Sequence, residues 1–206
     1  RSAAGSLHNS VEIGLIIEVL MKLLDVNAAV EGVVVPDVAV ISFYKEQVQQ
    51  LRTQIRRQIP AMRDIEVGTV DGFQGRQKDV VILSCVRSGD RGSIGFLSDA
   101  RRLNVAITRA RFTLIIVGDA WTLRQSWSED WNALLDDAVN RGCYVHIDGR
   151  PLDTIYVDAY NSRKGSSGQA SGRPPHLVSA QAKARSSRPR AQAEAVLLPL
   201  TRKLAH

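Results

Sequence analysis

Two polar segments of this sequence carry glycine and arginine where phosphate chemistry is possible. The first, Thr69–Asp79, reads TVDGFQGRQKD, and the second, Ala100–Arg111, reads ARRLNVAITRAR. Each lies between or beside runs of β-branched residues that are typical of buried strands. Glycine lets backbone amides approach an anion closely, and a guanidinium stays charged and can hold two phosphate oxygens. The pattern predicts a phosphate-handling sheet whose chemistry gathers at the carboxyl ends of its strands.

The hydrophobic pattern predicts the helices and strands that hold these two segments in place. A helix is predicted from about Ser10 to Asn27, because apolar residues recur at helical spacing there, and Asn9 with Glu12 resembles a capping box that would start it. Buried strands are predicted at Val38–Ile41, Ile65–Val70, Val80–Val86, Phe112–Val117 and Cys143–Ile147. The helices between them should cover both faces of a parallel sheet, because the run from Val80 to Val86 is almost continuously apolar.

Three helices are expected between the later strands. The first runs from Tyr44 to its end at Pro60, and the second begins at an N-cap formed by Ser98 and Asp99. The third is strongly amphipathic and ends at Arg141-Gly142. The three tryptophans are expected to fill the core or its rim, with base stacking as the alternative role: Trp121, Trp127 and Trp131.

At these segments the sequence resembles the Upf-like branch of superfamily-one helicases, which includes senataxin and the nonsense-mediated decay helicase. Thr69–Asp79 is similar to motif V of that family, and Arg101–Arg111 is similar to motif VI. Upstream, Val40–Gln47 resembles motif IV, and Asn9–Glu12 resembles the family stretch before it. The resemblance extends from about residue 5 to about residue 148. It implies an α/β, RecA-like P-loop NTPase fold with a mostly parallel sheet, as the second of two motor domains.

Charge divides the chain into two regions. Residues 1 to 160 hold 18 Lys/Arg and 20 Asp/Glu, whereas residues 161 to 206 hold 9 Lys/Arg and 1 Glu. We therefore predict a motor domain over residues 1–149 and a basic, disordered tail over residues 150–206, in which residues 191–204 could form a short transient helix. The tail could attract phosphate non-specifically or serve solubility alone.

Arg109 is the first catalytic candidate. The resemblance implies that it is an arginine finger that reaches across a cleft to the γ-phosphate of ATP. The residues alone favour a structural salt bridge to an acidic neighbour. The second catalytic candidate is Gln74, which can bond to water, ribose or an arginine. Arg102, two helical turns before Arg109, is predicted to orient motif V.

Several residues are predicted to bind the nucleotide through the resemblance. Tyr44 matches the motif IV tyrosine that stacks on adenine, although a core tyrosine at a strand end is the alternative. Gln77 stands where many relatives have an acidic residue, so hydrogen bonding is kept and charge is lost. The nucleotide-binding set is Tyr44, Gln47, Gly75, Gln77 and Arg109. Val48 replaces a second arginine found in some relatives, and Arg52 is a candidate substitute.

The nucleic-acid contacts are predicted at the start of motif V, at Thr69, Asp71 and Gly72. Taken alone, these residues form an ordinary strand-to-helix turn. The resemblance implies that motif V joins the nucleotide cleft to the surface that binds a single strand of RNA or DNA. It also implies ATP-driven translocation and unwinding in the 5′ to 3′ direction.

The sequence contains no GxxxxGK[ST] loop and no apolar strand ending in an acidic pair. ATP with Mg²⁺ should therefore be held mainly by an N-terminal RecA-like domain of the same parent protein, and Arg1 in place of Met suggests an N-terminus cut from a longer chain. Two rival interpretations remain: a nucleic-acid-binding module without turnover, and a truncated helicase fragment. Each rival lacks ATPase activity.

Other features narrow the class of protein. Cys85 and Cys143 are expected to be buried structural cysteines, because neither has CxxC spacing or a nearby histidine cluster, and no metal site is predicted. No apolar run approaches the roughly 18 residues needed to span a bilayer. An intracellular protein of the nucleus or cytoplasm, without membrane association, is expected.

Overall fold

The computed structural model describes residues 7–29, 36–89, 94–147 and 194–199. Its elements in chain order are α1 (Ser10–Ala29), β1 (Val38–Ser42), α2 (Lys45–Gln58), η1 (Pro60–Met62), β2 (Glu66–Thr69), η2 (Asp71–Phe73), β3 (Lys78–Ser84), η3 (Gly95–Ser98), α3 (Ala100–Ile107), β4 (Ala110–Gly118), α4 (Ala120–Gln125), α5 (Glu129–Asn140), β5 (Tyr144–Val145) and β6 (Glu194–Pro199).

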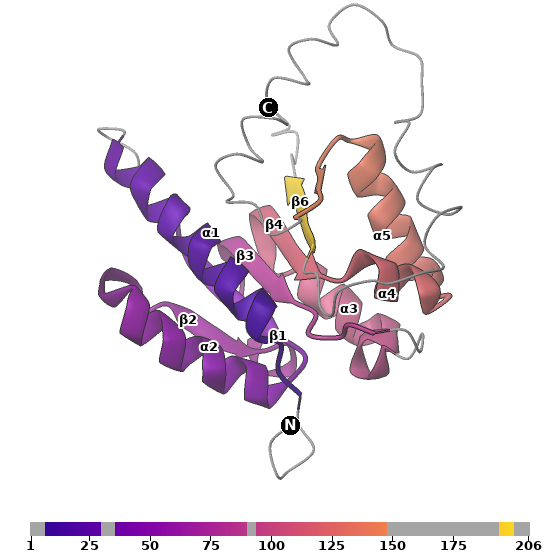
Figure 1. Cartoon of the computed structure of the whole chain (residues 1–206), viewed down its shortest axis with the longest axis horizontal. Helices are drawn as coiled ribbons and strands as arrows, with labels where there is room; N and C mark the ends of the chain where they lie inside the picture. The colour runs from indigo at the N-terminus through magenta and orange to yellow at the C-terminus, as the bar shows by residue number, and fades with distance from the viewer. Residues whose placement is uncertain (1–6, 30–35, 90–93, 148–193, 200–206) are drawn as a thin grey trace, which may run out of the picture.

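Within these described ranges, six strands form one sheet in the order β2-β1-β3-β4-β6-β5. The strands β1 to β4 are parallel to one another, whereas β6 is antiparallel to both β4 and β5. Figure 1 shows this sheet between two groups of helices. The arrangement confirms the predicted α/β fold with a mostly parallel sheet and is consistent with a RecA-like domain.

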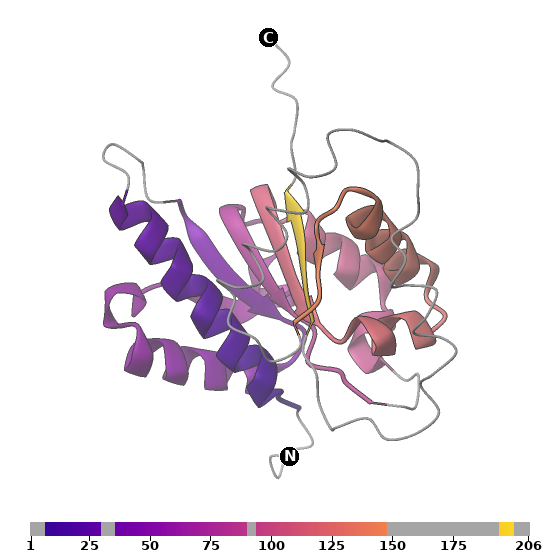
Figure 2. The same ribbon diagram turned by 45° about the horizontal axis from the view of Figure 1, so that its top comes forward.

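Both faces of the sheet are buried because β3 is apolar on both sides. Val81 and Leu83 belong to one core cluster and Ile82 to the other. The cluster around Ile82 lies under α1 and α2, and the opposite cluster lies under α3, α4 and α5, on the other side of the sheet in Figure 2. Both cysteines are buried and free, as predicted.

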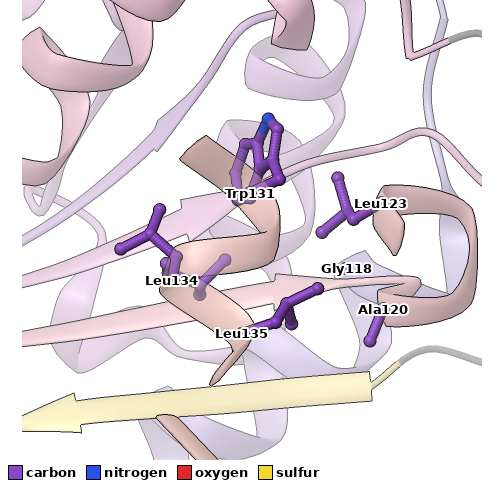
Figure 3. Close-up of a pocket in the computed structure, with 7 residues that line it drawn as sticks. Gly118, Ala120, Leu123, Trp131, Leu134 and Leu135 are labelled. Carbon is purple, nitrogen blue, oxygen red and sulfur yellow. The ribbon is translucent and has the colours of Figure 1, made fainter. Parts of the chain in front are cut away.

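The corner between β4, α4 and α5 is closely packed. Figure 3 shows the apolar side chains there, which surround a void of about 10 Å³, at the lower limit for one water molecule. Trp131 fills this corner at 1% exposure, and its indole Nε1 donates to the Leu97 carbonyl at 2.9 Å. The core prediction is therefore confirmed for Trp131.

The prediction is wrong for Trp127, which is 85% exposed. This residue lies in the turn between α4 and α5, where its backbone takes a φ of 58°. The tight turn, rather than hydrophobicity, decides the position of its side chain.

The short helix predicted for residues 191–204 is wrong for residues 194–199, which form β6. This strand pairs with β4 from Gly118 to Thr113 and satisfies an edge that β4 would otherwise leave unpaired. Tertiary pairing overrides the local helical preference of this segment. The remainder of the predicted tail, residues 150–193 and 200–206, lies outside the described residues.

Candidate functional site

The two polar segments lie side by side on the sheet face that α3, α4 and α5 cover. The motif V segment (Thr69–Asp79) leads from the carboxyl end of β2 to the start of β3, and α3 leads from η3 to the start of β4. Both connections must return across the face of the sheet because the strands they join are parallel. Asp71 contacts Arg102 at one end of the pair, and Arg76 contacts Arg109 at the other.

This placement corrects the expectation that all the chemistry gathers at the carboxyl ends of the strands. The carbonyl of Arg109 accepts from the backbone N–H of Lys78 at 2.9 Å, and these two residues directly precede or begin β4 and β3. Arg109 thus lies at the amino-terminal edge of the sheet, whereas Tyr44 follows the carboxyl end of β1. The candidate residues span the face from one edge to the other.

Arg109 is held by uncharged acceptors. Its Nε donates to the Val105 carbonyl at 2.9 Å, one terminal nitrogen donates to the Arg76 carbonyl at 3.0 Å, and the other donates to Thr108 Oγ1 at 3.0 Å. Within the described ranges it forms no ion pair. The side chain is half-buried. The structural salt bridge considered for this residue is therefore absent from the described part of the chain, and its positive charge is not neutralised there.

The turn next to Arg109 is open. Gln74, Gly75 and Gln77 are all exposed. Gly75 has a φ of +83°, a conformation that strongly favours glycine, and an added Cβ there would meet nothing within 4 Å. An anion could approach the backbone of this turn without steric hindrance.

Arg102 holds motif V to α3, as predicted. Its Nε and a terminal nitrogen donate to the two carboxylate oxygens of Asp71 at 3.0 and 2.7 Å, which is a bidentate ion pair. The guanidinium also lies over the rings of Phe43 and Phe96, 5.5 and 5.2 Å from their centroids. Asp71, predicted to contact nucleic acid, therefore uses its carboxylate on an intramolecular partner here.

The two motif IV candidates are buried. Tyr44 is 5% exposed, its ring lies 5.5 Å from that of Phe96, and burial raises the pKa of its hydroxyl. Gln47 is fully buried; its Oε1 accepts from the Asn9 backbone N–H at 2.8 Å, and its Nε2 donates to Ser84 Oγ at 2.8 Å. The described contacts of Gln47 are all within the domain, and its role toward a nucleotide stays a prediction.

A buried carboxylate that the sequence interpretation missed lies beside Gln47. Glu12 is 0% exposed and accepts from Ser84 Oγ at 2.6 Å and from the Val86 backbone N–H at 2.8 Å. Burial raises the pKa of Glu12 to about 7 in spite of these hydrogen bonds. Val86 itself has a φ of 71°, which is strained for a β-branched residue.

The capping prediction at the start of α1 is half right. Asn9 Oδ1 accepts from the backbone N–H groups of Val11 and Glu12, as an N-cap does. The Glu12 side chain accepts instead from Ser84 and Val86 inside the core. A signal for this was present, because Glu12 stands one helical turn before Ile16 on the apolar face of the helix.

A groove of about 420 Å³ lies on the other side of motif V, between α2 and the edge strand β2. It is lined by Lys45, Val48, Gln49, Arg52, Glu66, Val67, Gly68, Thr69, Gly72, Phe73 and Arg76. Two of the predicted nucleic-acid residues, Thr69 and Gly72, are therefore on this groove, and Thr69 Oγ1 accepts from the Gly72 N–H at 3.2 Å.

The groove has a positive balance of charge. Lys45, Arg52 and Arg76 line it with a single carboxylate, Glu66. That carboxylate is engaged by Lys78 at 2.9 Å and by Arg76, and the hydrogen bond from Lys78 lowers the pKa of Glu66. Arg52 donates from Nε to the Val67 carbonyl at 3.0 Å. The surface thus suits a phosphate backbone, and motif V separates it from the face that carries Arg109.

The described residues contain neither a metal-binding cluster nor a helix that could span a membrane. Histidine, cysteine, aspartate and glutamate nowhere gather there in a group of three that could hold a metal ion. None of the helices in this part of the chain has the length and apolar character needed to cross a membrane.

Comparison with known proteins agrees with the geometry. A family model described as an AAA domain matches residues 1–121. The chain is 39% identical over 141 residues to a probable helicase senataxin of Homo sapiens, covering 68% of this chain and 5% of that protein. It is 40% identical over 131 residues to helicase sen1 of Schizosaccharomyces pombe, covering 63% of this chain and 7% of that protein.

A third relative is regulator of nonsense transcripts 1 of Dictyostelium discoideum, 39% identical over 150 residues, with 70% of this chain and 11% of that protein covered. The chain thus spans a small part of the length of each of these three relatives. The matched residues include motifs IV, V and VI, on which the site is built. The chain belongs to this AAA domain family, as a domain of the Upf-like superfamily-one helicase type.

Proposed function

We propose that this chain is the second RecA-like motor domain of an ATP-dependent helicase or translocase, and that Arg109 is its arginine finger. The proposal rests on the hydrogen-bond partners of the Arg109 guanidinium. Its guanidinium is held in place by three uncharged acceptors and has no carboxylate partner among the described residues. A cation that is positioned but not neutralised is suited to stabilise charge that develops on a phosphoryl group.

The second half of the cleft belongs to another domain in this proposal. An N-terminal RecA-like domain of the parent protein would hold the phosphates and Mg²⁺ of ATP. This chain would supply the opposite wall, with Gln74, Gly75 and Gln77 next to Arg109 at the open turn. Gln74 would position water or ribose, because its amide both donates and accepts. The site works when the two domains close around ATP.

Single-stranded nucleic acid would lie along the groove lined by Thr69 and Gly72. Motif V is shared by the groove and the Arg109 face, so closure around ATP would move the groove relative to the strand. We propose translocation and unwinding on RNA or DNA, in the 5′ to 3′ direction that the resemblance implies. The protein would act inside the cell, in the nucleus or cytoplasm.

The test of Arg109 uses the protein that carries both motor domains. Arg109→Ala should lower kcat for ATP hydrolysis by roughly three to five orders of magnitude, as loss of an arginine finger does. Affinity for a fluorescent ATP analogue should change little, because the other domain holds most of the nucleotide. Arg109→Lys keeps the charge but loses the planar fork, so it should restore little of the rate.

The matched control is Arg101→Ala, which removes an exposed arginine from α3, the helix that ends two residues before Arg109. It should keep the wild-type kcat. Unchanged turnover in Arg109→Ala would remove the finger assignment, and an equal loss in Arg101→Ala would point to a general charge effect.

A second candidate function is nucleic-acid binding without turnover. The cationic groove favours it, since that surface needs no ATP to attract phosphate. This binding module, or a truncated fragment, would show strand affinity that does not respond to ATP when the chain is joined to a Walker A domain. The motor predicts that affinity changes with the nucleotide state.

A further inference from the structure

A second, smaller hollow adjoins the groove at the same edge of the sheet. Its volume is about 40 Å³, and its walls come from the second half of α2, the turn after η1 and the start of β2. The lining residues are Arg52, Ile55, Arg56, Arg63, Ile65 and Val67. Arg52 and Val67 also line the groove, so the two hollows are continuous. We call the smaller one the arginine pocket.

A helix and a tight turn bring the three arginines of this pocket together. Arg52 and Arg56 are four residues apart on α2, so they lie on one side of the helix. Pro60 begins η1, where its carbonyl accepts from the Arg63 N–H at 3.3 Å. The chain then enters β2, which lies beside α2 (Figure 1). Arg63 is thereby placed next to the later turns of α2.

The residues that line the arginine pocket do not neutralise its charge, since none of them is a carboxylate. Among the described residues, the Arg56 side chain has neither an ion pair nor a hydrogen bond. Arg63 pairs with Asp64 at 3.4 Å, but the two side chains are 73% and 91% exposed, so water and salt screen this pair. Arg52 donates from Nε and a terminal nitrogen to the Val67 carbonyl, which is uncharged.

Three guanidinium groups around one hollow repel one another. Like charges four residues apart on a helix are destabilising, and the apolar floor of Ile55 and Val67, 1% and 4% exposed, limits the screening by water. An anion between the arginines would remove this repulsion. The planar fork of each guanidinium matches the oxygens of a phosphate group, so the pocket is suited to phosphate.

We propose that the arginine pocket binds a phosphate group of the nucleic-acid strand, at a position beyond the groove. The inference rests on the proposed function, because it extends the surface assigned there to the strand. The pocket contains no residue of motifs IV, V or VI, whose segments are Val40–Gln47, Thr69–Asp79 and Arg101–Arg111. It is therefore an additional site beside the motif residues.

The continuity of the two hollows favours a strand over a free anion. Lys45 lines the groove and Arg56 lines the arginine pocket, and eleven positions of α2 separate them, roughly 16 Å along the helix axis. A single small anion does not reach both cations. A strand that lies along α2 would present one phosphate to the groove and a later one to the pocket.

The test is the salt dependence of oligothymidylate binding by the protein that carries both motor domains. Arg56→Ala should lower the slope of log Kobs against log salt by about 0.7, the value for one contact to a single strand. Over a fourfold rise in salt, the wild type should then lose about 2.6-fold more affinity than this variant. Arg56→Lys keeps the charge and should keep the wild-type slope.

Arg57→Ala is the matched control, because Arg57 is the next residue of α2, is also exposed and lines neither hollow. It should keep the wild-type slope. Thermal unfolding of each variant checks that the fold is intact, as expected for exposed side chains.

Two results would overturn the assignment: an unchanged slope in Arg56→Ala, or an equal loss in Arg57→Ala. If the slope is unchanged, but inorganic phosphate raises Tm over chloride at equal ionic strength less in Arg56→Ala than in the wild type, the pocket holds a free anion and not the strand. Lys45→Ala distinguishes failure of the proposed function. A lower slope in Lys45→Ala with none in Arg56→Ala removes only the arginine pocket, whereas an unchanged slope in both removes the groove as well.

Discussion

At the scale of single residues, Glu12 is a buried carboxyl group whose pKa lies far from its ordinary value. Its carboxylate is fully buried and surrounded by donors, from Ser84 Oγ, Asn9 Nδ2 and the Val86 backbone. Burial raises its pKa from 4.5 to about 7. A carboxyl group with a raised folded-state pKa binds its proton more tightly in the folded than in the unfolded chain. The free energy of unfolding should therefore fall as pH rises from 4.5 to about 7.

Denaturant unfolding at a series of pH values measures this effect. Glu12 contributes a fall of up to about 1.4 kcal/mol per pH unit inside that window, and Glu12→Gln should remove this contribution. Glu12→Gln should also be less stable than the wild type at low pH, because the amide N–H₂ would face the donors of Ser84 and Val86. Glu18→Gln, on the same helix but partly exposed, is the charge-matched control. A pH slope in Glu12→Gln equal to that of the wild type would contradict the assignment.

At the scale of elements, the register between motif V and α3 depends on the pair of Asp71 and Arg102. The two hydrogen bonds and the two flanking rings restrict the guanidinium to one place. A double-mutant cycle with Asp71→Ala and Arg102→Ala should give a coupling free energy of about 1 kcal/mol, at the upper end for exposed pairs, because the contact is bidentate.

The pair of Arg124 and Asp136 serves as the comparison for that cycle. It has a similar N–O distance of 2.7 Å and comparable exposure, but a single hydrogen bond joins it. The coupling free energy of this pair should be smaller than that of Asp71 and Arg102. Equal coupling free energies in the two pairs would mean that the bidentate geometry of Arg102 and its two flanking aromatic rings do not strengthen the contact between motif V and α3.

At the scale of the whole molecule, the groove and the Arg109 face are the two surfaces that motif V connects. The groove prediction can be measured as the salt dependence of single-strand binding, which counts the phosphates that a protein neutralises. Lys45→Ala should lower the slope of log Kobs against log salt by about 0.7, the value for one contact to a single strand. Residues 161–206, with their 9 Lys/Arg, are the same in every variant, so any contribution of these charges to the slope cancels in the comparison.

Arg57→Ala is the control for the groove, because Arg57 is an exposed cation on the same helix, α2, and does not line the groove. Its slope should match that of the wild type. If Lys45→Ala and Arg57→Ala lower the slope equally, binding depends on the total charge of the chain. The groove would then not be the surface that binds the strand.

The fold was largely predictable because the hydrophobic periodicity of the sequence indicates which face of each helix or strand is buried. The apolar run from Val80 to Val86 predicted a strand covered on both faces, and the structure has the two clusters it requires. Asp99 was predicted as an N-cap and accepts from the backbone N–H groups of Arg101 and Arg102. These features depend on interactions within a few residues or on the alternation of one strand.

Features that depend on distant residues were not predictable in the same way. The tilt of Tyr44 against Phe96, the exposure of Phe96 and the partner of Glu12 are set by residues that lie 52, 72 or more positions away along the chain. The strand β6 is a similar case, because its partner β4 precedes it by about 80 residues. The local secondary-structure preference of a segment does not depend on a strand so far away in the sequence, so it could not predict this pairing.

Residue type, spacing and hydrophobic period were sufficient to predict the family and the mostly parallel α/β architecture, and they named the candidate site residues, although they missed the buried carboxylate of Glu12. Only the tertiary structure decided that motif V and α3 lie side by side and that Arg109 has no carboxylate partner in the described part of the chain. The physical reason is that two parallel crossovers return over one sheet face, which brings residues into contact that no local pattern connects.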